Sequence, residues 1–562
     1  MSPVVSHDEI YYLAEAKTIA LDGLDLTGQV SPLSLQAANP LYAELPGLMM
    51  VPGALLFPNN PLLAGRFTHA VLGSAFALVL AGVVLQLFHS RKLALVTATV
   101  CLFNPWWFEN SRMSFDSLLS LFFYFSAIWV GLSSQKKMLP LSFLLFVLGF
   151  YQYQGLKILF LPMIFMMVLY QMKVFEERPV QWLKLVKKNY VYLVFFIIAI
   201  LFFGIHLFRL SQTEAGGRVN DLIFLNHDFI ETRMNKERAQ GLVSPLNKIL
   251  NNKATVLFEI FSEKYLNSFE FSQLFLHVDA LRNPFAVWSK GIFHLVDLPL
   301  ILVGIAVLFS QKKWRSQAIF ITTMVLIAPL PSAINSKDTW MFFRASFLFP
   351  WGILLSAMGL WKMWQVLKPR WLIAGVAGIY MIFIVMFFYD YFVRYPVYGT
   401  NQGYLAERVL SRYVKEESAV GKQVYVYAEE PYFTFTTYLT LANVIQKNSL
   451  DQIHQAYQSK VFAVNAVQVI GECFSPTKLG EHVAIVDARI PFCEGESEAM
   501  TNPSARIMIP SLIDSGSVYK IYNDSICQQY GLPPFSHVTK DVFQIESLPQ
   551  DTFCKSFFAV MR

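Results

Sequence analysis

Ten apolar segments, separated by short polar gaps, run along the chain from residue 66 to residue 393. A helix needs ~20 apolar residues to cross a bilayer core, and most of these segments approach that length. Those at 93–108 and 139–153 are shorter and could be tilted, broken or partly re-entrant. We predict spans at 66–88, 93–108, 115–132, 139–153, 157–172, 190–208, 293–310, 317–334, 345–361 and 371–393.

The polar gaps alternate in their content of lysine and arginine. The basic gaps are 89–92, 136–137, 173–188, 312–315 and 362–370. Loops rich in Lys and Arg are retained in the cytoplasm, so these gaps are predicted to be cytoplasmic. The remaining gaps then face outward, and they are 1–65, 104–114, 151–157, 209–292, 332–344 and the tail from 394.

The composition agrees with a polytopic membrane protein. Of 562 residues, 55% are hydrophobic and 15% are charged, and the mean hydropathy is +0.43. The net charge of +6 needs no nucleic acid to explain it, because much of the base lies in the predicted cytoplasmic loops. The chain carries no P-loop, no GxGxxG and no zinc-type His/Cys spacing, so a soluble nucleotide-dependent enzyme is not indicated.

After residue 393 the long apolar segments give way to an α/β pattern. A helix is expected over Gly403–Val414, followed by short β-branched or aromatic runs such as Val424–Tyr427 and Val483–Val486. The predicted fold class is therefore an α-helical polytopic membrane protein with a small C-terminal extracytoplasmic α/β domain. The membrane domain would cover 1–393, with outer loops at 1–65 and 209–292, and the α/β domain would cover 394–562.

Cysteine usage fits a tail on the outer side. Cys101 lies inside an apolar segment, whereas the tail contains Cys473, Cys493, Cys527 and Cys554. Four cysteines in an oxidising compartment permit two disulfides in any of three pairings. Four unpaired thiols are the alternative.

The start of the chain conflicts with this topology. Ten spans place both ends outside, yet residues 1–65 contain neither a signal peptide nor a span. We therefore expect an upstream transmembrane helix before the given start, which would bring the full architecture to eleven spans.

Ionisable residues at the outward ends of the spans are the candidates for function. Charges at a membrane boundary are costly, so they either reach back into water or serve a function. Acids and bases together suit a site for an anionic substrate, with a carboxylate as general base or metal ligand. The candidates are Asp8, Glu9, Arg66, Arg112, Asp116, Lys157 and Arg344.

Structural roles are the alternative for several of these residues. Asp8 and Glu9 could cap a helix that begins near them, and Asp116 could cap the span that it opens. Arg66 and Arg112 could be interfacial anchors.

The order of these motifs resembles the GT-C integral-membrane glycosyltransferases, especially the branch of protein O-mannosyltransferases and lipid A aminoarabinose transferases. An outer acidic pair precedes an A-x-R span start, an outer S-R-x-x-x-D and an outer Lys. The resemblance covers about 1–393. The matching stretches are Asp8–Tyr12, Ala64–Arg66, Ser111–Asp116, Tyr151–Lys157, Gly291–Phe293, Leu298–Gly304, Pro329–Ala333 and Phe343–Ala345.

The resemblance implies transfer of a sugar from a polyprenyl-phosphate donor to an acceptor on the outer face of a bacterial plasma membrane. It implies that Asp8 is the general base, supported by Glu9. Asp116 would be a second acid that orients the acceptor or binds a metal. A carboxylate is needed because an acceptor hydroxyl is a poor nucleophile until its proton is removed.

The resemblance also implies basic ligands for the donor phosphate, whose charge grows as it leaves. Lys157 and Arg344 would fill this role, with Arg66 and Arg112 as further candidates. Many relatives carry His-Pro-Pro or Lys-Pro-Pro in the first outer loop, where this chain has Asn39-Pro40-Leu41-Tyr42.

The expected partners are a polyprenyl-phosphate sugar donor, an acceptor glycan, lipid or protein, and membrane lipids, without nucleic acid. The cofactor is unknown, since a divalent metal is compatible with the acids but not required by them. A lipid-linked oligosaccharide polymerase or ligase would share the donor type and stays open. A transporter or flippase is a further alternative, although the span interiors contain almost no ionisable residues to line a path.

Overall fold

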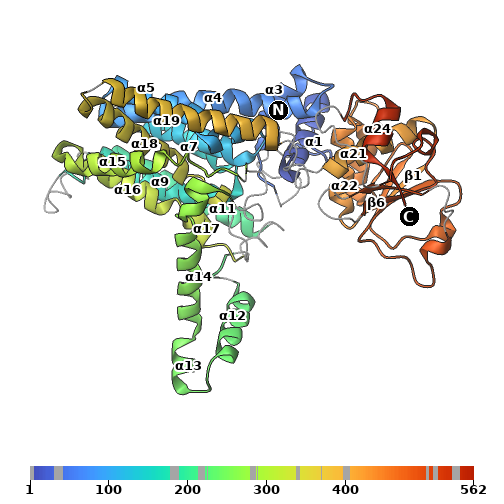
Figure 1. Ribbon diagram of the computed structural model, residues 1–562. Coiled ribbons are helices and arrows are strands. Elements are labelled where there is room, and N and C mark those ends of the chain that lie inside the picture. Colours follow the sequence, from blue (N-terminus) through green and yellow to red (C-terminus); the bar gives the residue numbers. More distant parts are fainter. Residues whose placement is uncertain are drawn as a thin grey trace.

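The computed structural model describes most of the chain. Helices dominate up to residue 395, and a mixed sheet with flanking helices follows from residue 405 (Figure 1). Asn39–Leu41 and Gly403, which entered the predictions above, lie outside the described residues. The described residues are 5–30, 42–133, 135–176, 189–212, 222–224, 226–278, 287, 289–336, 342–368, 370–395, 405–500, 506–510, 517–534 and 545–561.

A bundle of apolar helices forms the larger part of the structure, and one of its helices overlaps each predicted span. Together with the C-terminal sheet, this confirms a mostly helical membrane protein with an α/β region at its end. The bundle helices are α4 (Pro61–Phe88), α5 (Arg91–Phe103), α7 (Asp116–Gly131), α8 (Leu139–Phe150), α9 (Phe160–Gln171), α11 (Tyr190–Ser211), α15 (Asp297–Ser310), α16 (Arg315–Ile327), α18 (Leu348–Val366) and α19 (Arg370–Tyr389).

The number of helices that cross the membrane stays a prediction. Within the described residues, five helical stretches are long and apolar enough to cross a bilayer. α7 and α15 are apolar but shorter. The qualifying stretches are Pro61–Phe88, Gln154–Gln171, Tyr190–Ser211, Lys312–Ala333 and Ala374–Arg394.

Glycines allow α15 and α18 to pack backbone against backbone. A Cβ at Gly304 would lie 2.0 Å from the carbonyl oxygen of Leu355, and one at Gly359 would lie 1.9 Å from that of Leu300. Any side chain at either glycine would therefore separate the helices. Close contact through small residues is how apolar helices associate where no hydrophobic force drives them together.

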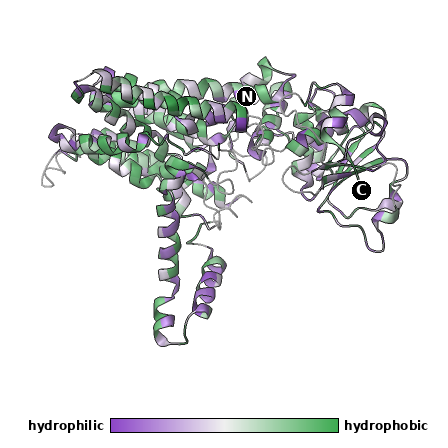
Figure 2. Ribbon diagram, in the orientation of Figure 1, coloured by the Kyte–Doolittle hydropathy of each residue, from purple (hydrophilic) through white to green (hydrophobic). Residues whose placement is uncertain are grey.

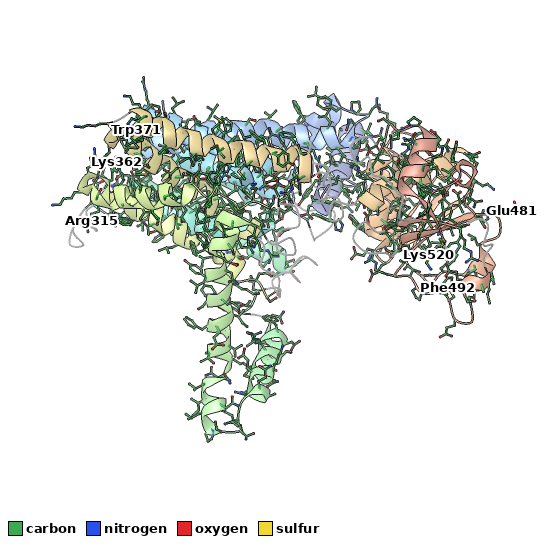
Figure 3. All side chains as sticks on the ribbon, viewed as in Figure 1. Arg315, Lys362, Trp371, Glu481, Phe492 and Lys520 are labelled. Carbon is green, nitrogen blue, oxygen red and sulfur yellow. A yellow bond between two sulfur atoms is a disulfide. The ribbon has the colours of Figure 1, made fainter. Side chains whose placement is uncertain are left out.

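The basic gaps gather at one end of this bundle. The Trp314 ring lies 5.1 Å from that of Phe88 and 6.3 Å from that of Trp361, so the gaps beside these residues are neighbours. Figure 3 labels Arg315 and Lys362 at this end, away from the C-terminal sheet. Three of the five basic gaps therefore lie together at one end of the bundle, and the assignment of that end to the cytoplasm stays a prediction.

The C-terminal region contains a seven-stranded mixed sheet of order β2-β3-β1-β4-β6-β5-β7. The three strands β3, β1 and β4 are parallel, with Val424 paired to Val467 and to Val483, and the other pairings are antiparallel. The strands are β1 (Val424–Tyr427), β2 (Ala463–Val464), β3 (Val467–Ile470), β4 (Val483–Asp487), β5 (Ile507–Pro510), β6 (Ser517–Tyr522) and β7 (Ala559–Val560).

Four helices accompany this sheet, and two disulfides link its connections. Cys473 is bonded to Cys493, and Cys527 to Cys554, which selects one of the three pairings left open by the sequence. Cys101 is a buried free thiol. The helices are α21 (Leu405–Ala419), α22 (Pro431–Leu441), α23 (Leu450–Ser459) and α24 (Gln550–Phe557).

The first helices of the chain share a hydrophobic core with the last region. Side chains of α1 (His7–Asp22) and α3 (Pro46–Leu56) belong to the same buried cluster as those of α21, α22 and the sheet. The ring of His7 lies 3.5 Å from that of Phe433, and Thr440 donates to the carbonyl of Ile10 at 3.4 Å. The predicted division at residue 393 stays a prediction, because this core joins the two ends of the chain.

A helical arm, residues 226–267, projects sideways from the bundle (Figure 1). The predicted amphipathic stretch Leu246–Leu266 lies within its last two helices. Its hydropathy is mixed, in contrast to the largely apolar bundle (Figure 2). The arm consists of α12 (His227–Gln240), α13 (Pro245–Leu250) and α14 (Lys253–Asn267).

Candidate active site

The start of α1 carries the predicted acidic pair. Ser6, not Asp8, is the N-cap, and its hydroxyl accepts from the backbone N–H of Glu9 at 3.0 Å. The Glu9 carboxylate in turn accepts from the N–H of Ser6 at 3.4 Å, which completes a capping box. Asp8 lies in the first turn without serving as the cap.

Glu9 and Arg66 form a buried ion pair between α1 and α4. Arg66 Nε donates to Glu9 Oε1 at 2.7 Å and Nη2 donates to Oε2 at 3.1 Å, and the N–H of Ser114 also reaches Oε1 at 3.4 Å. Burial alone would raise the pKa of Glu9, but the Arg66 guanidinium outweighs it and holds the pKa of Glu9 below its usual value. The pair ties α1 to α4 and to the segment before α7.

Asp116 is held by a tyrosine of α1. Tyr12 Oη donates to Asp116 Oδ2 at 2.9 Å and accepts from the backbone N–H of Ala43 at 2.9 Å. Burial and the nearby charges of Asp116 and Asp8 raise the pKa of Tyr12 well above its usual value, so the phenol stays a donor. Asp116 is the first residue of α7, whose N-cap is Phe115.

A cavity of about 380 Å³ collects four of the predicted site residues. Asp8 from α1 and Asp116 from α7 are acids in its lining, and Lys157 and Arg344 are bases. Most of the remaining lining is apolar, and Phe203, Leu207 and Leu210 of the largely exposed helix α11 are part of it. The cavity therefore brings two acids and two bases together beside a largely exposed apolar helix.

Lys157 enters the cavity with its charge partly balanced. Its ammonium donates to Glu44 Oε1 at 2.6 Å, and it lies 5.1 Å from the centre of the Phe150 ring. Both Lys157 and Glu44 are buried. Glu44 was not predicted, since a single acid beside Leu45-Pro46 carries no recognisable motif.

Arg344 lies in the short turn Phe342–Ala345 before α18 and is a hydrogen-bond partner of the Tyr153 hydroxyl. The Tyr153 hydroxyl is also close enough to Asp8 and Asp116 to interact electrostatically with both carboxylates. The acids and the arginine thus surround the same buried phenol.

The other predicted residues are not among those that line the cavity. Glu9 and Arg66 are engaged with one another, as described above. Arg112 lies 3.3 Å over the ring of Phe108 and donates to the carbonyl of that residue at 2.9 Å. The predicted roles of these three residues in the reaction stay predictions.

Sequence reasoning also missed a histidine in the cavity. His206 of α11 is part of the lining, and its ring lies 4.7 Å from the ring of Phe150. A lone histidine in an apolar segment offers a weak signal, although an ionisable residue inside a predicted span is itself grounds for suspecting a site. In the described part of the chain, no group of three or more His, Cys, Asp or Glu is placed to hold a metal ion.

The fold and the site define a class of protein: an integral membrane protein with acids and bases gathered in one cavity of its helical bundle, as in a membrane glycosyltransferase. The family model described as glucosyl transferase GtrII matches residues 53–358, which is more than half of the chain. The protein belongs to this glucosyl transferase family, so the predicted glycosyltransferase class is confirmed. The matched range includes Asp116, Lys157 and Arg344 but begins after Asp8.

Solved structures show a loose overall likeness. An oligosaccharyltransferase of Archaeoglobus fulgidus, tethered with an acceptor peptide, has a TM-score of 0.42 at 10% identity over 79% of this chain and 60% of that chain. AglB from the same organism, in complex with an inhibitory peptide and a dolichol-phosphate, has a TM-score of 0.43 at 10% identity, over 99% of this chain and 74% of that chain. ArnT from Cupriavidus metallidurans has a TM-score of 0.38 at 12% identity, over 87% of this chain and 89% of that chain. No curated protein matches the chain in sequence.

Proposed function

We propose that the protein transfers a glucosyl residue from a polyprenyl-phosphate donor to an acceptor hydroxyl at the outer face of a bacterial plasma membrane. The observation that carries this proposal is the cavity in which Asp8 and Asp116 share a space with Lys157 and Arg344. The family description supports the choice of glucose. The two disulfides of the C-terminal region support an oxidising, outer location for that end.

Asp8 acts as the general base. It takes the proton of the acceptor hydroxyl while the acceptor oxygen attacks the anomeric carbon. The bond from that carbon to the phosphate oxygen breaks, and its electron pair leaves with the polyprenyl phosphate. Asp116, held by the Tyr12 hydroxyl, orients the acceptor.

Arg344 and Lys157 stabilise the departing phosphate as its charge develops. His206 lies near Lys157 on the same side and adds a further polar contact. The apolar residues Phe203 and Leu207 of α11 pack against the first isoprenyl units of the donor, because α11 is largely exposed on the surface of the bundle.

The cavity favours a single sugar over an oligosaccharide. Its volume of about 380 Å³ lies at the lower end of the roughly 300–1,000 Å³ range of small-ligand sites. A monosaccharide phosphate suits such a space better than a long glycan. A polymerase or ligase that handles a lipid-linked oligosaccharide is therefore the weaker proposal.

The test is release of polyprenyl phosphate by the purified full chain in nanodiscs. Wild type should release it from polyprenyl-phosphate glucose and not from a nucleotide sugar. Asp8→Asn should lower the rate by ~10²-fold or more. Asp22→Asn is the matched control, since Asp22 is an exposed acid at the other end of α1.

Full activity of Asp8→Asn would remove Asp8 from the proposed role. A folded wild type that releases no lipid phosphate from any polyprenyl-phosphate sugar would overturn the proposed function itself.

A further inference from the structure

The arm is a helical hairpin with a small core of its own. α12 and α14 pack through Ile230, Met234, Val256 and Ile260, joined by Ile223 at the base. The exposed Arg233–Glu237 ion pair, 2.7 Å long, and the Lys253–Glu231 pair lie outside this core. The hairpin therefore has a defined shape away from the bundle.

The base of the arm is fixed where the apolar helix α16 ends. Tyr265 Oη donates to the carbonyl of Leu326 at 2.7 Å, and Lys264 Nζ donates to that of Asn335 at 2.7 Å. The opposite end of α16 carries the basic gap with Arg315. The base of the arm therefore lies at the predicted outer boundary of the bilayer.

The arm extends sideways from this boundary, across the direction of the bundle helices (Figure 1). Of the two long helices of the arm, α12 is the one nearer to the C-terminal sheet, and α14 is the one farther from it. A helix that leaves the bundle in this direction and at this level follows the surface of the surrounding bilayer. α14 is then the helix closer to the lipid.

The tip of the arm exposes apolar side chains that nothing in the described structure covers. Leu242 is 90% exposed, and Leu246, Ile249 and Leu250 are each more than 60% exposed. Phe258, further along α14, is 71% exposed. Burying aliphatic and aromatic side chains of this kind away from water lowers the free energy, so an apolar environment at the tip is favoured.

The charge around this tip suits an anionic surface. Between residues 232 and 256 the chain has a single acid, Glu237, which is paired with Arg233. The bases in this stretch are Arg233, Lys236, Arg238, Lys248 and Lys253. Basic side chains beside a cluster of aliphatic residues are typical of segments that lie in the headgroup layer of a membrane.

We propose that the arm lies on the outer leaflet of the bilayer. Its tip, residues 242–250, inserts Leu246 and its apolar neighbours at the boundary of headgroups and acyl chains. Lys236 and Lys248 contact the phosphates of anionic lipids.

The segments that hold the base of the arm also form part of the cavity wall. Leu222, Ile334 and Asn335 line the cavity, and the N–H of Ile223 donates to the carbonyl of Ile334 at 2.9 Å. The contact of the arm with lipid therefore fixes the depth of this wall relative to the membrane surface. The lipid contact itself does not depend on the reaction proposed above.

The test measures the depth of single labels in the full chain. Cys101 is buried and the other cysteines are in disulfides, so an introduced cysteine is labelled alone under native conditions. An environment-sensitive fluorophore at Leu246→Cys is compared with one at Asn235→Cys, an exposed position on α12. Nanodiscs contain phosphatidylglycerol and a lipid with a nitroxide high on its acyl chain.

The expected result is lipid quenching at least about twofold stronger at position 246 than at 235, with less quenching in discs of phosphatidylcholine alone. The double change Lys236→Gln and Lys248→Gln should remove this dependence on anionic lipid. Equal quenching of both labels by aqueous iodide, without lipid quenching, would overturn the proposal. So would protection from iodide that appears only when two copies share a disc, since that assigns the tip to a protein partner.

Discussion

Tyr12 and Asp116, separated by 104 positions in the chain, form a 2.9 Å hydrogen bond that joins α1 to α7. The same phenol accepts from the N–H of Ala43, so three segments meet at one oxygen atom. The bond leaves Asp116 in the lining of the cavity and fixes its carboxylate there. Tyr12 is therefore a positioning residue in the proposed reaction.

Replacement Tyr12→Phe should lower kcat about tenfold, which is ~1.4 kcal/mol in the barrier, with little change in the KM for the donor. The reason is that Asp116 loses the donor that orients it while the ring volume is kept. The measurement is steady-state release of polyprenyl phosphate. Tyr265→Phe also removes one tyrosine hydrogen bond, at a residue that is not among those lining the cavity, and should leave kcat unchanged.

Replacement Arg66→Ala should destabilise the protein by ~3–5 kcal/mol, because it leaves the Glu9 carboxylate buried without its partner. The expected readout is a lower Tm of the full chain in nanodiscs. Glu9→Gln should restore part of the loss in the double variant. A Tm equal to that of wild type would show that the pair is dispensable for stability.

The same pair makes stability depend on pH. The pKa of Glu9 is lowered in the folded protein from an unfolded value near 4.5, so its contribution is fully present above that value. The contribution is lost as the pH falls below about 4.5 towards the lower folded pKa. In Glu9→Gln with Arg66→Met this part of the acid sensitivity should be absent, as measured by Tm from pH 7 down to pH 3.

Replacement Lys157→Met should raise the KM for the donor about tenfold, because a cation facing the phosphate is lost. Glu44 would then be a buried carboxylate without its 2.6 Å partner, so the paired change Lys157→Met with Glu44→Gln serves as the control for misfolding. The double variant should regain stability but keep the weak donor binding. Recovery of the KM together with stability would contradict a phosphate role for Lys157.

Alkylation followed by mass spectrometry should find one reactive thiol in the denatured, unreduced protein. That thiol is Cys101, which is buried and should stay unlabelled until the fold is opened. The fragments should contain Cys473 linked to Cys493 and Cys527 linked to Cys554. Protein from an oxidising compartment with four free tail thiols would contradict both the pairing and the outer location of this region.

The helices and much of the cavity were predictable from the sequence for a physical reason. Apolar segments of sufficient length indicate membrane helices, and the alternation of basic and non-basic gaps assigns each loop to one side of the membrane or the other. Once sorted, Asp8, Asp116, Lys157 and Arg344 had to meet on one side, and all four line the cavity. The strands β1 and β4 were also found, because runs of β-branched and aromatic residues favour strands.

The ion-pair partners of these charged residues could not be predicted from the sequence in the same way. Charge and hydropathy place Glu9 and Arg66 at one boundary, but which acid meets which base depends on how the helices rotate and cross. Glu44 and His206 lie in the site without any local pattern, since each is a single ionisable residue among apolar neighbours. Such contacts are decided by tertiary packing, which a single sequence does not record.

The core shared by α1 and the C-terminal region has a consequence for the order of assembly. The helix that carries Asp8 precedes all the bundle helices in the chain, yet its apolar side is covered by α22 and its Lys17 contacts Asn443, which both follow the last bundle helix. During synthesis, α1 therefore lacks this covering until the chain beyond the last bundle helix has been made and has folded against it. A polypeptide that ends after residue 395 would contain every bundle helix described above and still leave this side of α1 uncovered, so we expect the C-terminal region to be needed to hold Asp8 in place.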